Sequence, residues 1–153
     1  MTWFEIVAAA ERVREGVASP ASRLPIAAIG WATVDQERAR AELDGLLASD
    51  PGAPRLGPWK PLDRDASLGA SVWARAALDP AGAPALVVLE PDTEGPLAAF
   101  LVRFGEGVAV IYLGLDSPAT GAGLPRLGHL LRGGPAWGPH IVVMESVAPR
   151  QSP

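Results

Sequence analysis

Apolar residues at helical spacing predict an amphipathic helix at the start of the chain, over residues 2–17. Its buried face combines Trp3, Ile6, Val7, Ala10, Val13 and Val17. Thr2 and Glu5 have the spacing of a capping box, in which each side chain binds the backbone amide of the other residue. We expect this helix to pack on the domain or on a second subunit.

Two apolar runs, residues 26–34 and 107–115, look like one strand used twice. Each ends at an aspartate, Asp35 or Asp116, whose side chain can cap a following helix. Directly after Asp35, the spacing of alanine and leucine predicts a helix over 36–48. A repeated strand-and-helix unit favours two related modules that together form a cup.

Shorter patterns predict the remaining elements. Residues 49–67 are rich in proline and glycine, which indicates a loop that can hold one short strand. Two strands, 69–78 and 84–90, are separated by a proline-glycine turn typical of a hairpin. The later elements are a helix from Asp92 or Thr93 to Gly105, a weak helix near 119–132 and a strand over His140–Glu145. This order of elements indicates an α+β domain.

Composition excludes several classes of protein without identifying a reaction. A chain of 153 residues is long enough for one domain with a real core. A net charge of −4, with Lys60 as the only lysine, leaves no basic cluster for nucleic acid. The absence of cysteine excludes disulfides, thiolate catalysis and cysteine-bound zinc. No stretch has the pattern of a secretion signal or a membrane span, so we expect a cytoplasmic protein.

Three short stretches carry a resemblance to a known superfamily. Ile29–Asp35 is similar to its first strand and turn, and Leu86–Pro91 to its fourth strand. Phe104–Asp116 is similar to the start of its second module, where a glycine-glutamate-glycine sequence precedes the strand, and it is the most specific of the three. The sequence thus resembles the vicinal oxygen chelate (glyoxalase/bleomycin resistance/dioxygenase) superfamily, closest to methylmalonyl-CoA epimerase-like domains. The N-terminal helix and residues 117–137 have no counterpart in this resemblance.

The resemblance implies a fold of paired βαβββ modules forming a curled mixed sheet, the glyoxalase-like cup. We therefore expect a single domain over residues 1–153, with the N-terminal helix at 2–17 as an addition. The first module spans 26–91, a linking helix spans 92–105, and a shortened second module spans 106–147.

The resemblance also implies a divalent metal held in the cup by histidine, glutamate or glutamine. Its four ligand positions fall on Ala28, Val87, Val110 and Val143, and none of these side chains has a donor atom for a metal. If the last strand shifts by two residues, Glu145 replaces Val143 on the same face. We therefore expect no metal and no other cofactor.

The sequence assigns no catalytic residue, although a few side chains are outside candidates. Glu106 lies between two glycines, where the backbone can approach a ligand closely, so it is a candidate general acid or base. The competing interpretation is that Glu106 shapes the turn into its strand. Glu145 is the other candidate, and a metal site made of His129, His140 and Glu145 is a minor alternative.

The lining of the cup is the stronger candidate for a binding site. Alternation along the strand places Trp73 and Arg75 on one face, and Tyr112 shares the face of Val110. If both faces look into the cup, these side chains form an aromatic wall with one cation, suited to a planar or apolar ligand that carries an anion. The competing interpretation places Arg75 toward solvent and packs Trp73 against a helix.

The other tryptophans have more varied expected roles. Trp31 has the opposite parity to Ala28, so we expect it to pack on a helix. Trp59 and Trp137 lie in proline- and glycine-rich loops, where tryptophan can close over a ligand or fill a dimer interface. We include Trp137 in the candidate ligand-binding set.

Together these patterns favour a metal-free, diverged glyoxalase-like protein that binds a small apolar or aromatic molecule, with or without a negative charge. One alternative is an isomerase or lyase of the methylmalonyl-CoA epimerase or glyoxalase type. The second is a non-catalytic dimerisation module with a filled cup. A homodimer is expected because the short second module leaves a sheet edge that needs cover. No nucleic acid or membrane partner is expected.

Overall fold

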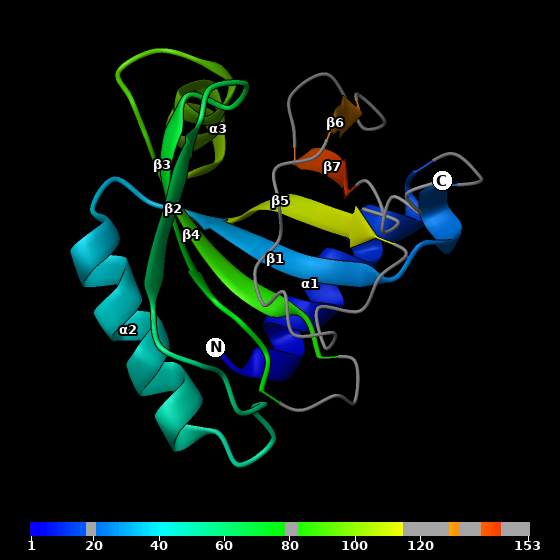
Figure 1. The fold of residues 1–153 in the computed structure, drawn as a ribbon, viewed down its shortest axis with the longest axis vertical. Coiled ribbons are helices and arrows are strands. Elements are labelled where there is room, and N and C mark those ends of the chain that lie inside the picture. The colour runs from blue at the N-terminus through cyan, green and yellow to red at the C-terminus, as the bar shows by residue number, and fades with distance from the viewer. Residues whose placement is uncertain (18–20, 79–82, 115–128, 132–138, 145–153) are drawn as a thin grey trace, which may run out of the picture.

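A computed structural model of the chain describes residues 1–17, 21–78, 83–114, 129–131 and 139–144 (Figure 1). In these residues the elements, in chain order, are α1 (Trp3–Glu15), a 3-10 turn (Ala21–Arg23), β1 (Ile26–Ala32), α2 (Gln36–Ser49), β2 (Lys60–Asp65), β3 (Ala70–Arg75), β4 (Ala85–Pro91), α3 (Pro96–Phe104), β5 (Gly107–Gly114), β6 (His129–Leu131) and β7 (His140–Met144). β2 is the short strand that the proline-rich loop was expected to allow. None of the described helices is long and apolar enough to cross a bilayer.

All of these strands join one sheet in the order β2-β3-β4-β1-β5-β7-β6. β1 pairs in parallel with β4, and β5 pairs in parallel with β7. The two leading strands, β1 and β5, pair antiparallel with each other at the centre. β3 and β6 then add antiparallel to β4 and β7. Each half of the sheet repeats the same arrangement, so the predicted fold class, α+β with paired modules in one curled mixed sheet, is confirmed.

The second half of the sheet is the shorter one within the described residues. It contains β5, β6 and β7, whereas the first half contains β1, α2 and three further strands. The weak helix expected near 119–132 is wrong at residues 129–131, which form β6, and residues 119–128 lie outside the described part. Residues 129–131 instead pair antiparallel with β7, whose edge offers backbone hydrogen-bond partners to a strand.

Two apolar clusters bury the sheet from opposite sides. The helix face is covered by Trp3, Ile6 and Ala10 of α1 and by Ala39 and Leu43 of α2. Figure 1 shows α1 behind β1 and β5 in this view. The other side, which we call the cup face, receives Leu97 and Phe100 from α3. Because side chains alternate along a strand, each central strand feeds both clusters and its sequence is continuously apolar.

The caps of α1 and α2 agree with their sequence signals. The Thr2 side chain accepts a hydrogen bond from the Glu5 amide, and the Glu5 carboxylate accepts one from the Thr2 amide at 2.7 Å, which completes the capping box. Asp35 caps α2 by accepting the Arg38 amide at 3.1 Å. Beyond the helices, the Trp3 amide donates to Asp50 at 2.9 Å and so ties the start of α1 to the end of α2.

The start of α3 differs from the expectation. Neither Asp92 nor Thr93 caps this helix; Gly95 is its N-cap, with φ at 124°, and Pro96 is its first residue. Proline suits this position because its fixed φ is helical and it has no amide that needs a partner. The positive φ favours glycine at position 95, because L side chains rarely adopt this backbone conformation.

β2 forms one edge of the sheet and is poorly suited to pairing with another chain. It carries Lys60, Pro61, Asp63 and Arg64 in a run of six residues. Charged side chains and proline on an edge strand discourage edge-to-edge association. Contact between copies of this chain through β2 is therefore disfavoured.

Candidate functional site

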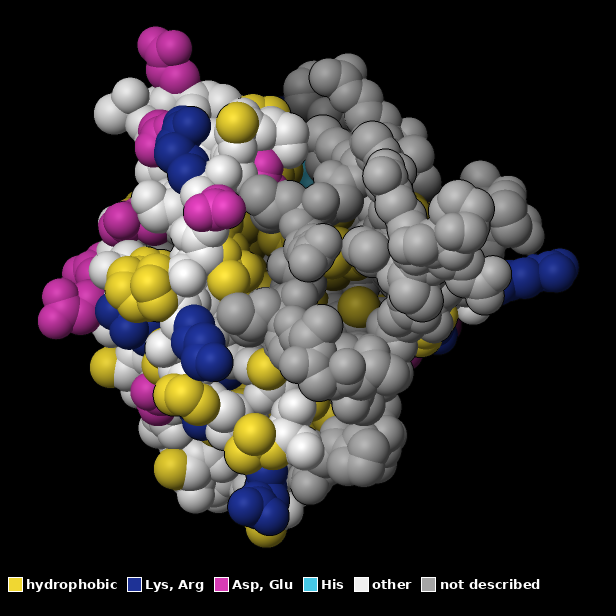
Figure 2. Space-filling view, viewed as in Figure 1, with side chains coloured by type: hydrophobic (Ala, Val, Ile, Leu, Met, Phe, Trp, Pro, Cys, Tyr) yellow, Lys and Arg dark blue, Asp and Glu magenta, His cyan; other side chains and the backbone are white. Residues whose placement is uncertain are grey.

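Small and aliphatic side chains make up most of the cup face. Its strand residues are Ala28, Ala32, Ala70, Val72, Ala74, Ala85, Val87, Leu89, Ala109, Val110, Tyr112 and Val142. The partly buried Leu62, Leu101 and Met144 pack against them. Figure 2 shows hydrophobic side chains gathered through the middle of the view, next to the residues drawn in grey. A face of this composition suits an apolar ligand, with a few polar atoms setting its orientation.

Three of the four positions implied for metal ligands lie together on the cup face. Ala28, Val87 and Val110 are fully buried in its apolar cluster. They have no donor atoms, so the residues present do not fit a divalent metal at these positions. In the described part of the chain, no three His, Asp or Glu side chains gather as metal ligands would.

The register of β7 differs by one residue from the expected one. β7 places Ile141 beside Ile111 and Val142 beside Tyr112. Val142 therefore lies on the cup face, whereas Val143 packs with the helix-face cluster. The assignment of Val143 to a cup position is wrong, because a shift of one residue moves a side chain to the opposite face.

Gly30 marks a closely packed place in the floor of the cup face. It lies between Val87 of β4 and Val110 of β5 in the ladder. A Cβ atom added at Gly30 would lie 2.8 Å from Cδ1 of Leu89 and 2.9 Å from Cβ of Val110. The space above Gly30 is thus filled by protein side chains, so a ligand of this face lies elsewhere on it.

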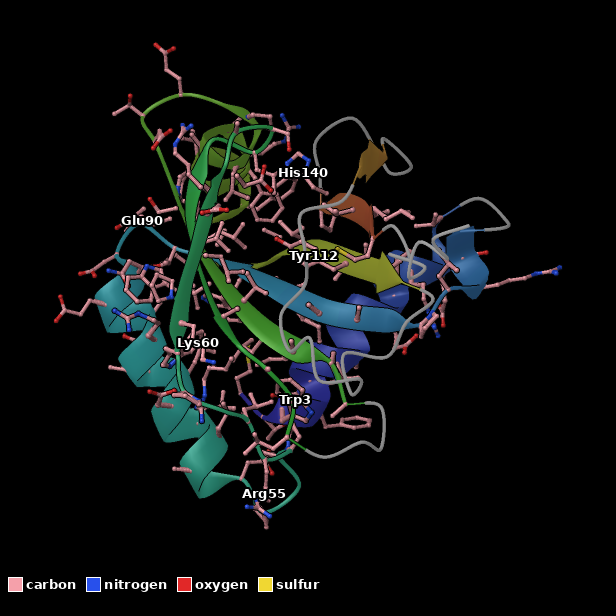
Figure 3. All side chains as sticks on the ribbon, in the orientation of Figure 1. Trp3, Arg55, Lys60, Glu90, Tyr112 and His140 are labelled. Atoms are coloured by element: carbon pink, nitrogen blue, oxygen red, sulfur yellow. The ribbon has the colours of Figure 1, made fainter. Side chains whose placement is uncertain are left out.

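Tyr112 brings a hydroxyl group into this apolar face (Figure 3). Its side chain is 1% exposed, and its Oη atom has no hydrogen-bond partner among the described residues. Burial raises the pKa of Tyr112, and the negative charge of Asp65 raises it further, so the phenol keeps its proton. Because a buried polar group without a partner costs about 1–3 kcal/mol, this hydroxyl is a donor that an added acceptor would stabilise.

Asp65 is a second buried polar group on the same side, and the sequence did not single it out. It lies across the β2–β3 ladder from Ala70, a cup-face residue, and is 4% exposed. Its Oδ1 atom accepts the Leu68 amide at 3.0 Å and the Ser67 hydroxyl at 2.7 Å. An aspartate ending a strand, two residues before a serine, is a signal for this type of turn.

His140 lies at the start of β7, beside Val110, which places it on the cup face. It is half-buried, and Figure 3 shows it on the strand next to that of Tyr112. His129 belongs to β6, opposite Val143. The alternative metal site of both histidines with Glu145 stays a prediction, because Glu145 lies outside the described residues.

Trp73 lies on the helix face, so the expected wall that combines it with Tyr112 is wrong. Its partner across the β3–β4 ladder is Val88, a helix-face residue. The guanidinium of Arg40, on α2, lies 4.1 Å from the centroid of the Trp73 ring. This is the competing interpretation of Trp73, in which the ring packs against a helix, and a cation on an aromatic face favours it.

Arg75 also belongs to the helix face and is not the cation of the cup. It donates to Asp44 of α2 at 2.8 Å and to the carbonyl oxygens of Gly57 at 2.6 Å and Leu56 at 3.1 Å. Asp44 also accepts the indole N–H of Trp59 at 2.8 Å. α2 and the loop before β2 offer these acceptors, which explains why the guanidinium lies on that side.

The Glu106 carboxylate, directly before β5, is bound by one hydroxyl group and one guanidinium group. It accepts a hydrogen bond from the Thr33 hydroxyl and two from Arg38, at 2.6 and 2.7 Å. The Thr33 hydrogen bond, followed by Arg38, lowers the pKa of Glu106. A carboxylate with a lowered pKa is a weaker base, so the contacts favour the turn-shaping interpretation over general-base catalysis.

The remaining candidates have mixed outcomes. Trp31 packs with the helix-face cluster, as expected from its parity. Trp137 and Glu145 lie outside the described residues, so their assignments stay predictions.

Comparisons with known proteins give structural likeness and no sequence match. Neither a family model nor a curated protein matches the sequence. A Streptomyces coelicolor methylmalonyl-CoA epimerase variant, solved with 2-nitronate-propionyl-CoA, is 25% identical over 60% of this chain and 62% of its own, with a TM-score of 0.43. Methylmalonyl-CoA epimerase from Mycobacterium tuberculosis is 18% identical over 68% of this chain and 63% of its own, with a TM-score of 0.47.

Both of these neighbours are methylmalonyl-CoA epimerases. The chain spans less than two thirds of the length of either epimerase. Because both TM-scores lie below 0.5, a function for this protein has to be inferred from its own side chains.

Proposed function

We propose that this protein binds a small, largely apolar molecule on its cup face, without a metal at the positions implied by the superfamily. The observation that carries this proposal is the Tyr112 hydroxyl, buried without a partner in the described structure. Folded proteins satisfy the great majority of their buried polar groups, and an exception in an otherwise apolar face is typical of a place that a ligand completes.

The catalytic alternative, an isomerase or lyase, has less support from the described residues. Glu106 is occupied by Thr33 and Arg38, and its lowered pKa disfavours proton abstraction. The positions implied for metal ligands carry Ala28, Val87 and Val110 on the cup face and Val143 on the helix face. Binding is thus the function that these side chains perform most readily.

A dimerisation module is the second candidate, and exposed apolar side chains favour it. Phe4 on α1 is 78% exposed, and Val102 on α3 is 90% exposed. The close packing of Leu89 and Val110 around Gly30 also fits such a module, in which protein side chains fill the cup. A homodimer and a cytoplasmic location stay predictions from the sequence.

Native mass spectrometry of the freshly purified protein, compared with its denatured mass, tests the proposal. We expect an organic adduct that is lost on denaturation. Tyr112→Phe should reduce its occupancy, whereas Trp73→Phe, an aromatic change on the helix face, should not. A stoichiometric divalent ion would contradict the metal-free proposal and favour the enzyme. A bare dimer, with equal behaviour of both variants, would favour the dimerisation module.

A further inference from the structure

We infer that the ligand of the cup face presents an uncharged hydrogen-bond acceptor, such as an amide or ketone oxygen, to Tyr112 and carries no negative charge. This inference rests on the proposed function and gives it a class of ligand. It also replaces the expectation of an anionic group, which depended on Arg75.

The Tyr112 hydroxyl is the hydrogen-bond donor that calls for an acceptor on the ligand. Its strand neighbours on the cup face are Ala28 and Val142, neither of which has a polar side-chain atom. The hydroxyl has no acceptor in the described structure, and burial together with Asp65 raises the pKa of Tyr112, so it remains an O–H donor. The ligand must therefore supply an oxygen or nitrogen with a free lone pair.

The apolar side chains of the cup face determine the polarity of the rest of the ligand. Ala28 and Val142 flank Tyr112 on the neighbouring strands, and Met144 packs against the same apolar cluster. An acceptor that enters this face has to be joined to an apolar body, since a strongly hydrated group would lose water without replacement.

The exclusion of negative charge follows from Asp65 and Arg75. Asp65 is buried on the cup side of the sheet, close enough for its charge to act on the Tyr112 hydroxyl. Like charges repel strongly where burial lowers the dielectric constant. Arg75, the cation expected to balance an anion, is bound to Asp44 on the helix face. A carboxylate ligand would therefore meet repulsion and no compensation from these residues.

The test uses three probes of matched shape: benzamide, benzoate and toluene. Their affinities for the full chain are measured by saturation-transfer NMR titration at about pH 8, where the carboxyl group of benzoate is ionised. We expect benzamide to bind at least about tenfold more tightly than benzoate. Tyr112→Phe should weaken benzamide about fivefold, the usual effect of one neutral hydrogen bond, and leave toluene unchanged.

Two further variants separate charge from shape. Asp65→Asn keeps an acceptor for the Leu68 amide and removes the charge, so benzoate should bind several-fold more tightly to it. Trp73→Phe, on the helix face, should change none of the affinities.

The outcomes distinguish this inference from the proposed function. If toluene binds but benzoate equals or exceeds benzamide, the inference is overturned and the binding function survives. Equal loss of benzamide and toluene in Tyr112→Phe also overturns the inference, since the hydroxyl then does not select the acceptor. If none of the three probes binds up to its solubility limit, the binding function is overturned together with the inference.

Discussion

Replacing Tyr112 by phenylalanine should stabilise the ligand-free protein, although a buried side chain is being shortened. Tyr112→Phe removes one oxygen atom and keeps the ring that packs on the cup face. The lost hydroxyl belongs to a residue that is 1% exposed and makes no hydrogen bond to the described residues, so the change removes a desolvation cost and no compensating bond.

The expected gain is about 1–2 kcal/mol, within the usual cost of an unsatisfied buried polar group. In a domain of this size, a change of 1 kcal/mol moves the Tm by about 2–4 °C, so the Tm should rise by roughly 2–8 °C. A stabilising change that weakens ligand binding is the usual relation between stability and function at a binding site.

Thr33→Val is the matched control, because it also deletes one buried hydroxyl with little change of shape. Thr33 is fully buried, donates to the Glu106 carboxylate and accepts the Asp35 amide at 3.1 Å. Its loss should destabilise the protein by about 1.5–3 kcal/mol, since one partner is charged. The two hydroxyl deletions are thus predicted to have opposite signs.

Urea unfolding of both variants and the wild type measures these free energies. Each protein is first refolded from denaturant, so that no co-purified molecule remains bound. If Tyr112→Phe destabilises the protein by about 1 kcal/mol or more, its hydroxyl has a native partner and the reasoning about an open donor is refuted. Unchanged m-values would show that the denatured state is not responsible for the differences.

Three further changes test the packing and the polar contacts. Gly30→Ala should destabilise the protein by about 1–3 kcal/mol in urea unfolding, because the new methyl group would crowd Leu89 and Val110; an unchanged midpoint would show that the floor can relax. Arg75→Lys should cost about 1–3 kcal/mol by the same assay, because a single ammonium cannot replace the fork that joins α2 to the loop before β2, and it should leave toluene binding unchanged. Glu106→Gln should reduce the fall in the free energy of unfolding that the protein shows as the pH is lowered. The pKa of Glu106 is lowered in the folded state, so its ionised form contributes stability above the unfolded value of about 4.3, and this contribution is lost as the pH falls through the lower folded value. Wild type and variant should therefore differ at about pH 6, and the difference should begin to shrink below about pH 4.3 and vanish only below the lowered folded pKa; a constant difference would contradict this origin.

The order and boundaries of most elements could be predicted because their signals are local. The capping box of Thr2 and Glu5 and the cap at Asp35 depend on neighbours three positions away, and each acts as expected. The repeated strand was also a sound guide, since β1 and β5 lie side by side at the centre of the sheet. The two caps depend only on residues that are close together in the sequence.

The site was harder to predict because alternation gives the relative faces of residues but not which face looks into the cup. Trp73 and Arg75 share a face, as predicted, but that face meets α2, where Arg40 and Asp44 supply their partners. Those partners are distant in sequence and invisible to the strand pattern. Val143 was misplaced for a related reason: a strand apolar on both faces gives no sign of a one-residue shift.

The most direct test of the cup face as a binding face is NMR of Tyr112 itself. Tyr112 is the only tyrosine in the chain, so protein labelled with ¹³C at the tyrosine ζ carbon gives one signal, next to the hydroxyl. Benzamide should shift this signal progressively and saturably, with the same dissociation constant as the saturation-transfer titration, and the signal should not titrate up to about pH 10, because the pKa of the buried phenol is raised. If benzamide saturates the protein while the Tyr112 signal does not move, the ligand binds elsewhere, and the assignment of the cup face as the binding face is contradicted.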